Sequence, residues 1–235
     1  MRIDRHSASE IASWVLVLSA VLTTLLIVRR EFVQEETTTA PEARYVDGWE
    51  DALTIGRRSG PADAPVQVVE FADFECPYCA LFETTMQAVR DKYPDQVAFT
   101  MAYYPLSNHL YAESAARAAE CAHRQGRFEA MRVLLFEEQQ AFGSVPWTHF
   151  AEQVGISDIE QFDACVNDIG TFERLEQGKK LGDQLGVRGT PTVLINGWQM
   201  PGAPTPEMFD MIVNNVLEGR LPAENMVFHA KTVRN

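Results

Sequence analysis

Two cysteines separated by two residues form the part of this sequence with the clearest chemical potential. Cys76 and Cys79 enclose Pro77 and Tyr78, and a pair at this spacing can alternate between two thiols and a disulfide. The pair follows the apolar run 66–71 and opens a segment with helical periodicity. A helix N-terminus carries unpaired N–H groups and the positive end of the helix dipole, which stabilise a thiolate. The motif therefore predicts Cys76 as an exposed attacking thiolate and Cys79 as the shielded resolving thiol.

Other functions of a Cys-x-x-Cys pair stay open on the residues alone. A zinc site needs a second pair of ligands at close spacing, whereas Cys121 and Cys165 each stand alone in the sequence. The five histidines show no ligand spacing either, and we expect His109 to be an ordinary residue at a helix start. A purely structural disulfide is the other alternative, although it does not need a junction between a strand and a helix. We therefore predict no metal site.

Two further features suit thiol chemistry. Glu70 lies within the apolar strand that precedes the pair, and a buried carboxylate has a raised pKa, which suits accepting a proton from Cys79. A glutamate on an edge strand that faces water is the alternative. Pro191 follows Thr190 immediately before a short apolar run. A cis bond to this proline would place a backbone carbonyl and amide opposite the cysteines.

The elements that must position these residues are predicted from hydrophobic periodicity, caps and turn signals. Asn196-Gly197 favours a hairpin, the segment that starts at Ser157 has a capping-box pattern, and Thr205 can cap the last helix. We expect strands at 66–71 and 97–103 around a helix at 77–92, then helices at 112–123, 128–140, 146–154, from 157 and at 169–185, and finally strands at 192–195 and 198–200 and a helix at 206–217.

The N-terminal part of the chain predicts an anchor and a tether. Residues 11–28 contain no charged side chain and would span about 27 Å as a helix, close to the thickness of a bilayer's hydrocarbon core. Because no small-residue cleavage site follows, we expect a retained signal-anchor rather than a cleaved signal peptide or a buried core helix. Residues 1–10 are then cytoplasmic. Residues 29–60 form a polar linker, in which Trp49 and Leu53 contact the domain.

Composition sets the class of protein. The chain has 235 residues, of which 46% are hydrophobic and 23% charged, values that exclude collagen-like and wholly disordered chains. Its net charge of −13 disfavours a nucleic-acid partner, because a phosphate backbone would be repelled. Four cysteines are too few for a disulfide scaffold, but an even number permits two pairs.

These motifs together resemble the DsbA-like family of thiol–disulfide oxidoreductases. The resemblance rests on Glu70, on Cys76-Pro77-Tyr78-Cys79 and on Gly189-Thr190-Pro191-Thr192, with a helical block between the last two motifs. It covers the chain from about residue 62 to residue 217. It implies an α/β, thioredoxin-like fold at 61–235, with an all-helical insertion at about 107–185, preceded by a single N-terminal transmembrane helix.

The resemblance also implies a role for each residue of the site. Cys76 would be the nucleophile, Cys79 the resolving cysteine and Glu70 the buried acid. The substrate-binding residues would be the cis-proline Pro191 with Thr190, Pro77 and Tyr78. Cys121 and Cys165 would form a structural disulfide within the insertion, with two buried free cysteines as the alternative. No cofactor is implied.

The implied protein is an enzyme on the extracytoplasmic, periplasmic side of a bacterial cell membrane. It would exchange disulfides with secreted or envelope proteins and would need a membrane redox partner for turnover. Pro77-Tyr78 lacks the histidine found between the cysteines of the strongest oxidants, and Glu75 opposes a thiolate. We therefore expect a Cys76 pKa below that of a free thiol but less depressed than in those oxidants. An oxidant is expected; a dedicated reductase or isomerase, or a chaperone or binding module with a structural pair, is the alternative.

Overall fold

The computed structural model describes residues 5–34, 42–168, 170 and 172–226. Residues 1–4 of the expected cytoplasmic segment, 35–41 of the linker and 227–235 of the domain lie outside this part of the chain. Helix α1 (Arg5–Gln34) and the compact unit that begins at Glu42 are separate units. Among the described residues, no helix combines the length and the apolarity that crossing a membrane requires.

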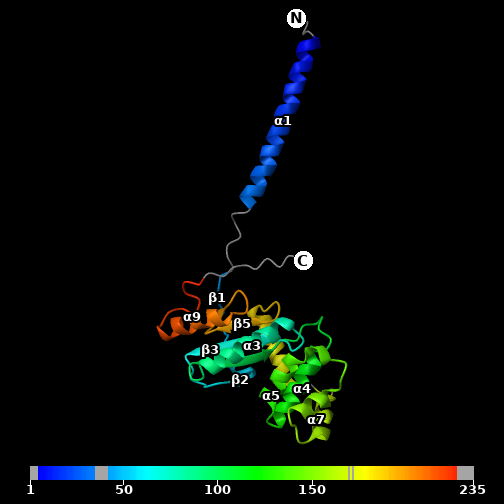
Figure 1. Ribbon diagram of the computed structural model, residues 1–235, viewed down its shortest axis with the longest axis vertical. Coiled ribbons are helices and arrows are strands. Elements are labelled where there is room, and N and C mark those ends of the chain that lie inside the picture. Colours follow the sequence, from blue (N-terminus) through cyan, green and yellow to red (C-terminus); the bar gives the residue numbers. More distant parts are fainter. Residues whose placement is uncertain (1–4, 35–41, 169, 171, 227–235) are drawn as a thin grey trace. The chain divides into compact units, whose positions relative to one another are not determined.

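A mixed β-sheet forms the centre of the compact unit (Figure 1). In the described residues it has six strands in the order β1-β6-β5-β3-β4-β2. The central strands are β3 (Val66–Ala72), β4 (Val97–Tyr103) and β5 (Thr192–Ile195), and the outer strands are β1 (Arg44–Tyr45), β2 (Arg57–Ser59) and β6 (Trp198–Gln199). Asn196 and Gly197 both have positive φ angles, 47° and 83°, which confirms the hairpin expected between β5 and β6.

The sheet's core is a β-α-β unit followed by an antiparallel strand. Helix α3 (Pro77–Lys92) connects β3 to the parallel strand β4, while β5 runs antiparallel on the other side of β3. Proline at the first position of α3 is compatible with a helix start, because that N–H has no partner within the helix. All four predicted elements are present, and α3 has the predicted bounds.

The folded unit starts earlier than the sequence predicted. The expected linker at 29–60 contains β1, helix α2 (Asp51–Ile55) and β2, and the two strands form opposite edges of the sheet. Trp49 is 8% exposed and Leu53 packs against the same cluster, so the expected contacts are present. The segment is polar because edge strands and a short amphipathic helix bury only one side, which gives little hydrophobic periodicity.

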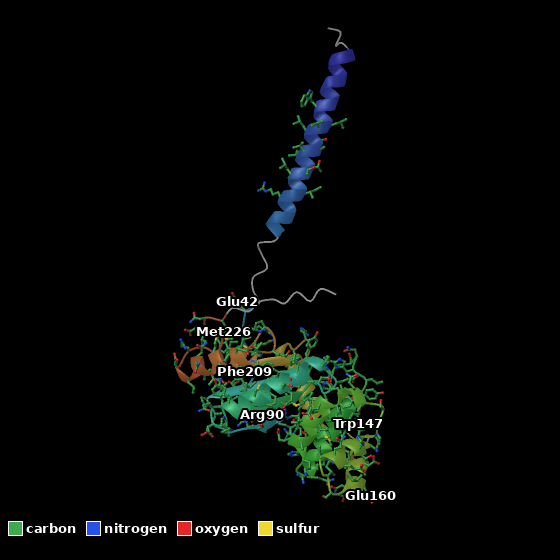
Figure 2. All side chains as sticks on the ribbon, viewed as in Figure 1. Glu42, Arg90, Trp147, Glu160, Phe209 and Met226 are labelled. Atoms are coloured by element: carbon green, nitrogen blue, oxygen red, sulfur yellow. A yellow bond between two sulfur atoms is a disulfide. The ribbon has the colours of Figure 1, made fainter. Side chains whose placement is uncertain are left out.

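Helices cover both faces of the sheet. Val69 and Phe71 of β3 share a core cluster with residues of α2 and helix α8 (Glu173–Leu185). The other face carries Val68 and Glu70, and α3 packs there beside the terminal helix α9 (Pro206–Leu217), on which Figure 2 labels Phe209. The ring of Phe209 stacks on that of Phe82 in α3. The side chain of Thr205 accepts the Met208 N–H, which confirms the predicted cap of α9.

The helical insertion gathers at one end of the sheet (Figure 1). Its helices are those predicted, but several of their boundaries differ from the prediction. The helix expected at 128–140 ends at Glu137 and is followed by a short 3-10 helix. The helix expected at 169–185 begins at Glu173. The helix expected from residue 157 is capped by Asp158, which accepts the Gln161 N–H, rather than by Ser157. The elements before α8 are α4 (Ala112–Arg124), α5 (Phe128–Glu137), η1 (Gln139–Ala141), α6 (Trp147–Gln153) and α7 (Ile159–Val166).

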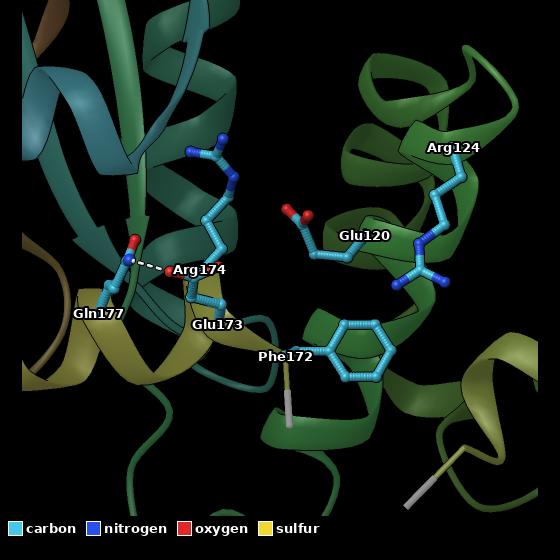
Figure 3. A pocket seen from close by; sticks show the side chains of 6 residues that line it. All are labelled: Glu120, Arg124, Phe172, Glu173, Arg174 and Gln177. Carbon is cyan, nitrogen blue, oxygen red and sulfur yellow. Dashed lines mark hydrogen bonds between the residues drawn. The ribbon is translucent and has the colours of Figure 1, made fainter. Parts of the chain in front are cut away.

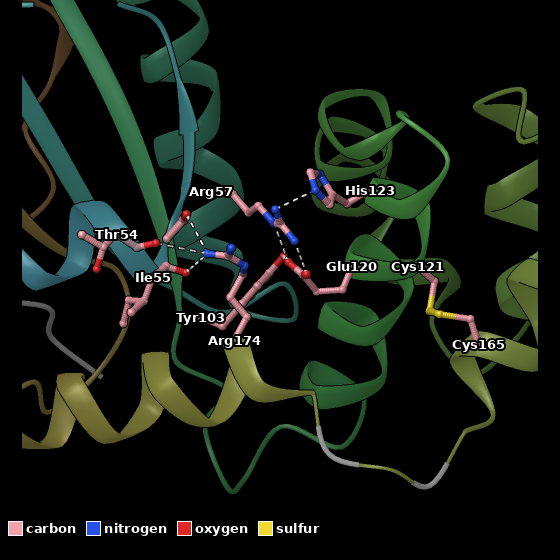
Figure 4. Close-up of polar contacts among 10 residues, drawn as sticks. Thr54, Ile55, Arg57, Tyr103, Glu120, Cys121, His123, Cys165 and Arg174 are labelled. Carbon is pink, nitrogen blue, oxygen red and sulfur yellow. Dashed lines mark hydrogen bonds and ion pairs between the residues drawn. A yellow bond between two sulfur atoms is a disulfide. The ribbon is translucent and has the colours of Figure 1, made fainter. Parts of the chain in front are cut away.

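A polar cluster joins the insertion to the sheet (Figure 4). Arg57 of β2 forms a two-pronged ion pair with Glu120 of α4, and the Tyr103 hydroxyl donates to the same carboxylate at 2.7 Å. Within the insertion, Cys121 and Cys165 form a disulfide that connects α4 to α7, as the resemblance implied. The insertion is therefore tied both to itself and to the domain.

Candidate active site

The Cys-x-x-Cys pair lies where β3 ends and α3 begins, as predicted. Cys76 is the N-cap of α3, with φ −77° and ψ 118°, and its carbonyl oxygen accepts the N–H groups of Cys79 and Ala80 at 3.1 and 3.2 Å. Both cysteines are thiols in the structure. At this position the Cys76 sulfur lies beside the free N–H groups of the first helical turn.

The surroundings of Cys76 favour its thiolate. A hydrogen bond with the Cys79 thiol lowers the pKa of Cys76 most, burial opposes this, and Thr190 and the N–H groups of Cys79 and Tyr78 lower it further, to about 5. The Cys76 thiol also donates to the carbonyl oxygen of Thr190 at 3.2 Å. By contrast, burial raises the pKa of Cys79, and the hydrogen bond to Cys76 raises it further. The two thiols thus have opposite character, attacking and resolving.

Cys76 is more enclosed than the sequence suggested. It is 3% exposed, and Cys79 is fully buried. The enclosure comes from the turn at Thr190-Pro191, whose backbone accepts the hydrogen bond from the thiol. Tyr78, in contrast, is 64% exposed at the start of α3.

The predicted proline turn lies opposite the cysteine. The Thr190–Pro191 peptide bond is cis, and the Thr192 hydroxyl donates to the Gly189 carbonyl at 2.8 Å across the turn. Strand β5 begins directly afterwards and pairs with β3, which carries the cysteine motif at its end. Because β3 and β5 are antiparallel neighbours, the turn before β5 and the cysteine motif after β3 lie at the same end of these two strands.

Glu70 occupies the middle of the sheet rather than an edge. It pairs with Met101 of β4 on one side and Val193 of β5 on the other, and it is 1% exposed. Burial, and then the charge of Glu83, raise the pKa of Glu70 to about 8, although Arg132 and Cys79 act in the opposite direction. Its Oε1 has no hydrogen-bond partner among the described residues. A carboxyl group in this state can exchange a proton with Cys79 near neutral pH.

A buried ion-pair network lies beside Glu70. Glu83 follows Cys79 by one helical turn on the buried face of α3, and its carboxylate bonds to Arg132 of α5 and to Arg90, the latter at 2.7 Å. The Arg132 side chain is 1% exposed and also bonds to Glu129 at 2.9 Å. Charges of both signs therefore act on Glu70 through a poorly solvated interior.

Two carboxylates brace the loop that leads into α3. Asp73 accepts the N–H of Glu75 and, from the start of the insertion, the N–H of Leu106 and the ring Nδ1 of His109, each at 2.8 Å. Glu75 accepts the N–H of Tyr111 at 2.5 Å. His109 is thus held by Asp73, in contrast to the ordinary helix-start residue that the sequence predicted.

A cavity of about 430 Å³ lies between α4 and α8, and neither cysteine of the pair lines it (Figure 3). It is lined by Glu120, Arg124, Phe172, Glu173, Arg174 and Gln177. Arg174 uses its guanidinium on carbonyl groups at the end of α2 (Figure 4). Across the described part of the chain, no group of three acidic, histidine or cysteine side chains could hold a metal ion.

The structure brings together the predicted residues Glu70, Cys76, Cys79, Thr190 and Pro191. Sequence reasoning missed a second set, which consists of Asp73, Glu83, Arg132 and Gln139. A partial signal existed only for Glu83, because it follows Cys79 by four positions and so shares its helix face. Each of the other three also makes a contact with a residue 33 or more positions away: Asp73 accepts the Leu106 N–H, Arg132 bonds to Glu83, and Gln139 donates to the Phe74 carbonyl. No local sequence pattern marks such contacts.

Known proteins share this fold. The family model described as "Thioredoxin" matches residues 54–215. The crystal structure of a thioredoxin-like oxidoreductase from Silicibacter pomeroyi DSS-3 is similar with a TM-score of 0.60 and 26% identity, covering 72% of this chain and 97% of that chain. Oxidised BdbD from Bacillus subtilis is similar with a TM-score of 0.65 and 18% identity, covering 77% and 100%.

Curated relatives are much longer proteins. The Na(+)/H(+) antiporter NhaA 3 of Salinispora tropica is 37% identical over 139 residues, which is 59% of this chain and 21% of the antiporter. The NhaA 1 antiporter of Salinispora arenicola is 34% identical over 163 residues, or 68% of this chain and 24% of that protein. The matched segment therefore spans about a fifth to a quarter of these relatives.

Proposed function

Because the chain belongs to the thioredoxin family, we propose that it is a DsbA-like thiol–disulfide oxidoreductase, which exchanges disulfides with other proteins through Cys76 and Cys79. One observation carries this proposal: the two thiols have pKa values moved in opposite directions, with that of Cys76 lowered to about 5. An attacking thiol must be ionised, whereas a resolving thiol must stay protonated until the mixed disulfide has formed.

The proposed reaction begins with the oxidised pair. A substrate thiolate attacks the Cys76 sulfur, a bond forms between the two sulfurs, and the Cys76–Cys79 bond breaks. Cys79 leaves as a thiolate and takes a proton, for which Glu70 is the adjacent donor. A second substrate thiolate then attacks the substrate sulfur of the mixed disulfide and releases Cys76 as its stable thiolate. Two electrons pass from the substrate to the cysteine pair.

We propose that the protein acts as an oxidant. Stabilising the Cys76 thiolate stabilises the reduced pair, and this makes the disulfide a stronger oxidant. A pKa of about 5 lies between the values of about 3.5 in DsbA and about 7 in thioredoxin. The reduction potential against glutathione tests the direction. A value near −120 mV indicates an oxidant, while a value near −270 mV overturns this direction and indicates a reductase.

The exchange itself is tested by cysteine substitution. Cys79→Ser should accumulate covalent mixed disulfides with disulfide-containing proteins, because the Cys76 thiolate still attacks the substrate disulfide and displaces one of its sulfurs, but Cys79 is no longer present to resolve the product. Cys76→Ser should abolish both insulin reduction and oxidative refolding of a reduced substrate while the fold stays intact. If Cys76→Ser keeps its activity, the pair is structural and the protein is a binding module.

We propose further that residues 11–28 tether the catalytic domain to the outer face of a bacterial membrane, where its substrates are secreted or envelope proteins and a membrane redox partner reoxidises it. The run has no charged side chain. Within α1, the hydroxyl of Ser19 donates to the Leu16 carbonyl at 2.9 Å and that of Thr24 to Ala20 at 2.8 Å, so these groups are satisfied inside the helix.

Membrane attachment is tested with the full chain expressed in bacteria. The protein should stay with the membranes after an alkaline carbonate wash, and protease added outside the inner membrane should digest the catalytic domain. Replacing Leu18 and Leu22, which are both exposed on α1, by arginine should release the protein. Full release of the unaltered chain by carbonate, or protection from external protease, would contradict the proposal.

A further inference from the structure

A glutamine of the helical insertion contacts the backbone of the cysteine motif directly. Gln139 lies in η1, the short helix that follows α5. Its Nε2 donates to the carbonyl oxygen of Phe74 at 2.7 Å and to that of Cys76 at 2.9 Å. The side-chain amide carries two hydrogens, so one serves each carbonyl. These two bonds cross 65 and 63 positions of sequence.

The orientation of the Cys76 carbonyl affects the geometry of the start of α3. It accepts the first N–H groups of α3, from Cys79 and Ala80, so its direction fixes where the helix starts. The Cys76 N–H in turn donates to the Asp73 carbonyl at 3.1 Å. Cys76 stays extended, with ψ 118°, while the next residue is helical. Only this conformation leaves the sulfur beside the N–H groups of the first turn.

The packing around Gln139 keeps the amide in place. Phe136, three residues earlier on α5, packs against Phe74 with 4.7 Å between ring centroids and an angle of 40° between the ring planes. Both aromatic rings are buried. The insertion thus contacts the turn before α3 in two ways, through the packing of Phe136 on Phe74 and through the two hydrogen bonds that Gln139 donates. Asp73 and Glu75 also connect the turn to the insertion, but of these side chains only Gln139 donates to the backbone of Cys76 itself.

We propose that Gln139 is a positioning residue for the reaction, which holds Cys76 in the conformation that exposes its sulfur to the amides of α3. The inference rests on the proposed function and assigns to the helical insertion a direct part in setting the redox equilibrium of the pair. Gln139 does not touch the substrate or the sulfur; it acts through the Phe74 and Cys76 carbonyls.

The proposal fixes the sign of the effect. Without the amide, the Cys76 turn can relax, and the thiolate receives weaker hydrogen bonds from the first turn. The thiolate pKa should then rise, and the reduced pair should become less favourable relative to the disulfide. One hydrogen bond of ordinary strength corresponds to about a threefold to tenfold change in an equilibrium constant. For a two-electron couple this is a potential more negative by about 15 to 30 mV.

The neighbouring glutamine offers a matched control. Gln140 is exposed in the same short helix, and within the described residues its side chain forms no hydrogen bond. We compare Gln139→Leu with Gln140→Leu in the full chain, by titrating the thiolate absorbance of Cys76 and by equilibration with glutathione. Gln139→Leu should raise the thiolate midpoint and shift the equilibrium toward the disulfide by the stated factor. Gln140→Leu should leave both values unchanged.

A purely structural contact gives a different result. If Gln139→Leu lowers the thermal midpoint of unfolding but leaves the thiolate midpoint and the potential at their wild-type values, the proposal is wrong. Gln139→Glu keeps the shape of the side chain and guards against misfolding of the leucine variant. Because an ionised carboxylate cannot donate to the two carbonyls, it should move both values in the same direction, and wild-type values in this variant also overturn the proposal.

The same measurements separate this inference from the proposed function. If the wild-type protein shows no thiolate step below pH 8 and does not exchange with glutathione, the proposed function fails. If the wild type exchanges and titrates as expected but the Gln139 variants do not differ from it, only the role of Gln139 fails.

Discussion

The Cys76 thiol donates a hydrogen bond to the Thr190 carbonyl oxygen at 3.2 Å, although 114 positions separate the two residues. The contact places the nucleophile against the same backbone that we expect an extended substrate to meet. The sulfur thus contacts the turn before β5 as well as the Cys79 thiol. The geometry therefore couples the reactivity of Cys76 to the place where a substrate chain would lie.

The titration of Cys76 gives the first prediction. Its pKa is lowered to about 5, so ultraviolet thiolate absorbance of the reduced protein should rise through a midpoint near pH 5. Cys76→Ser should remove this step, whereas Cys79→Ala should keep a step and move it upward, because alanine removes the Cys79 thiol, whose hydrogen bond lowers the Cys76 pKa most. The absence of any step below pH 8 would contradict the assignment of Cys76.

Glu70 should make the stability of the reduced protein depend on pH. Its pKa is about 8 in the folded protein against 4.5 in the reference state, so between these values the folded protein keeps a proton that the unfolded chain has lost. Cys76, whose pKa is lowered to about 5, contributes a slope of the opposite sign in both the wild type and the Glu70→Gln variant. The contribution of Glu70 to stability should fall as the pH rises through this window, by at most roughly 1.4 kcal/mol per pH unit. Glu70→Gln should lack this slope.

Urea unfolding of both proteins between pH 5 and pH 8 measures this difference. The advantage of Glu70→Gln over the wild type should grow with pH and become constant above pH 8. A difference that does not change with pH would show that Glu70 has an ordinary pKa in the folded protein.

The ion pair beside Glu70 should set the pH at which Cys79 is deprotonated. Glu83 raises the pKa of Glu70 and Arg132 lowers it. Glu83→Gln should therefore move the pH profile of Cys79 attack to lower pH, and Arg132→Met should move it to higher pH. The release of thionitrobenzoate from a mixed disulfide on Cys76 measures this step directly. Lys179→Gln, in an exposed ion pair, is the control.

Both substitutions should also destabilise the fold, because each removes one partner of a buried charge. Arg132 still pairs with Glu129 in Glu83→Gln, and Glu83 still pairs with Arg90 in Arg132→Met, so the cost should stay below the roughly 3–5 kcal/mol of a buried charge without any partner. A general loss of structure would slow the release of thionitrobenzoate in both variants without moving the pH midpoints apart. If the pH midpoint of thionitrobenzoate release moves in the same direction in Glu83→Gln and Arg132→Met, the Glu83–Arg132 ion pair affects Glu70 through the structure rather than through its charges.

The disulfide of the insertion should support stability without taking part in exchange. Cys121 and Cys165 are separated by 44 positions, and closing a loop of this size contributes at most roughly 4 kcal/mol. Replacing both by alanine should lower the urea midpoint and leave the rate of exchange at Cys76 nearly unchanged. Loss of the exchange rate in a folded double variant would instead connect this disulfide to the active site.

The chain's local signals were sufficient for most elements. Pro77 at a helix start, Asn196-Gly197 and Thr205 each favour one local geometry, so α3, the hairpin after β5 and the cap of α9 could be predicted from sequence. The same holds for Glu70, because a carboxylate within an apolar β-branched run is informative by itself. Residues 44–59 escaped prediction because short edge strands lack a periodic apolar pattern.

The sequence by itself determined which residues carry the chemistry, because a cysteine pair at a strand-to-helix junction has its reactivity built into the local backbone. Only the tertiary structure decided how strongly that reactivity is tuned. Thr190, Arg132 and Gln139 reach the site from β5's entry turn and from the helical insertion. Hydrogen bonds and charges act over a few ångströms of space, whatever the separation along the chain, so their partners emerge only when the chain has folded.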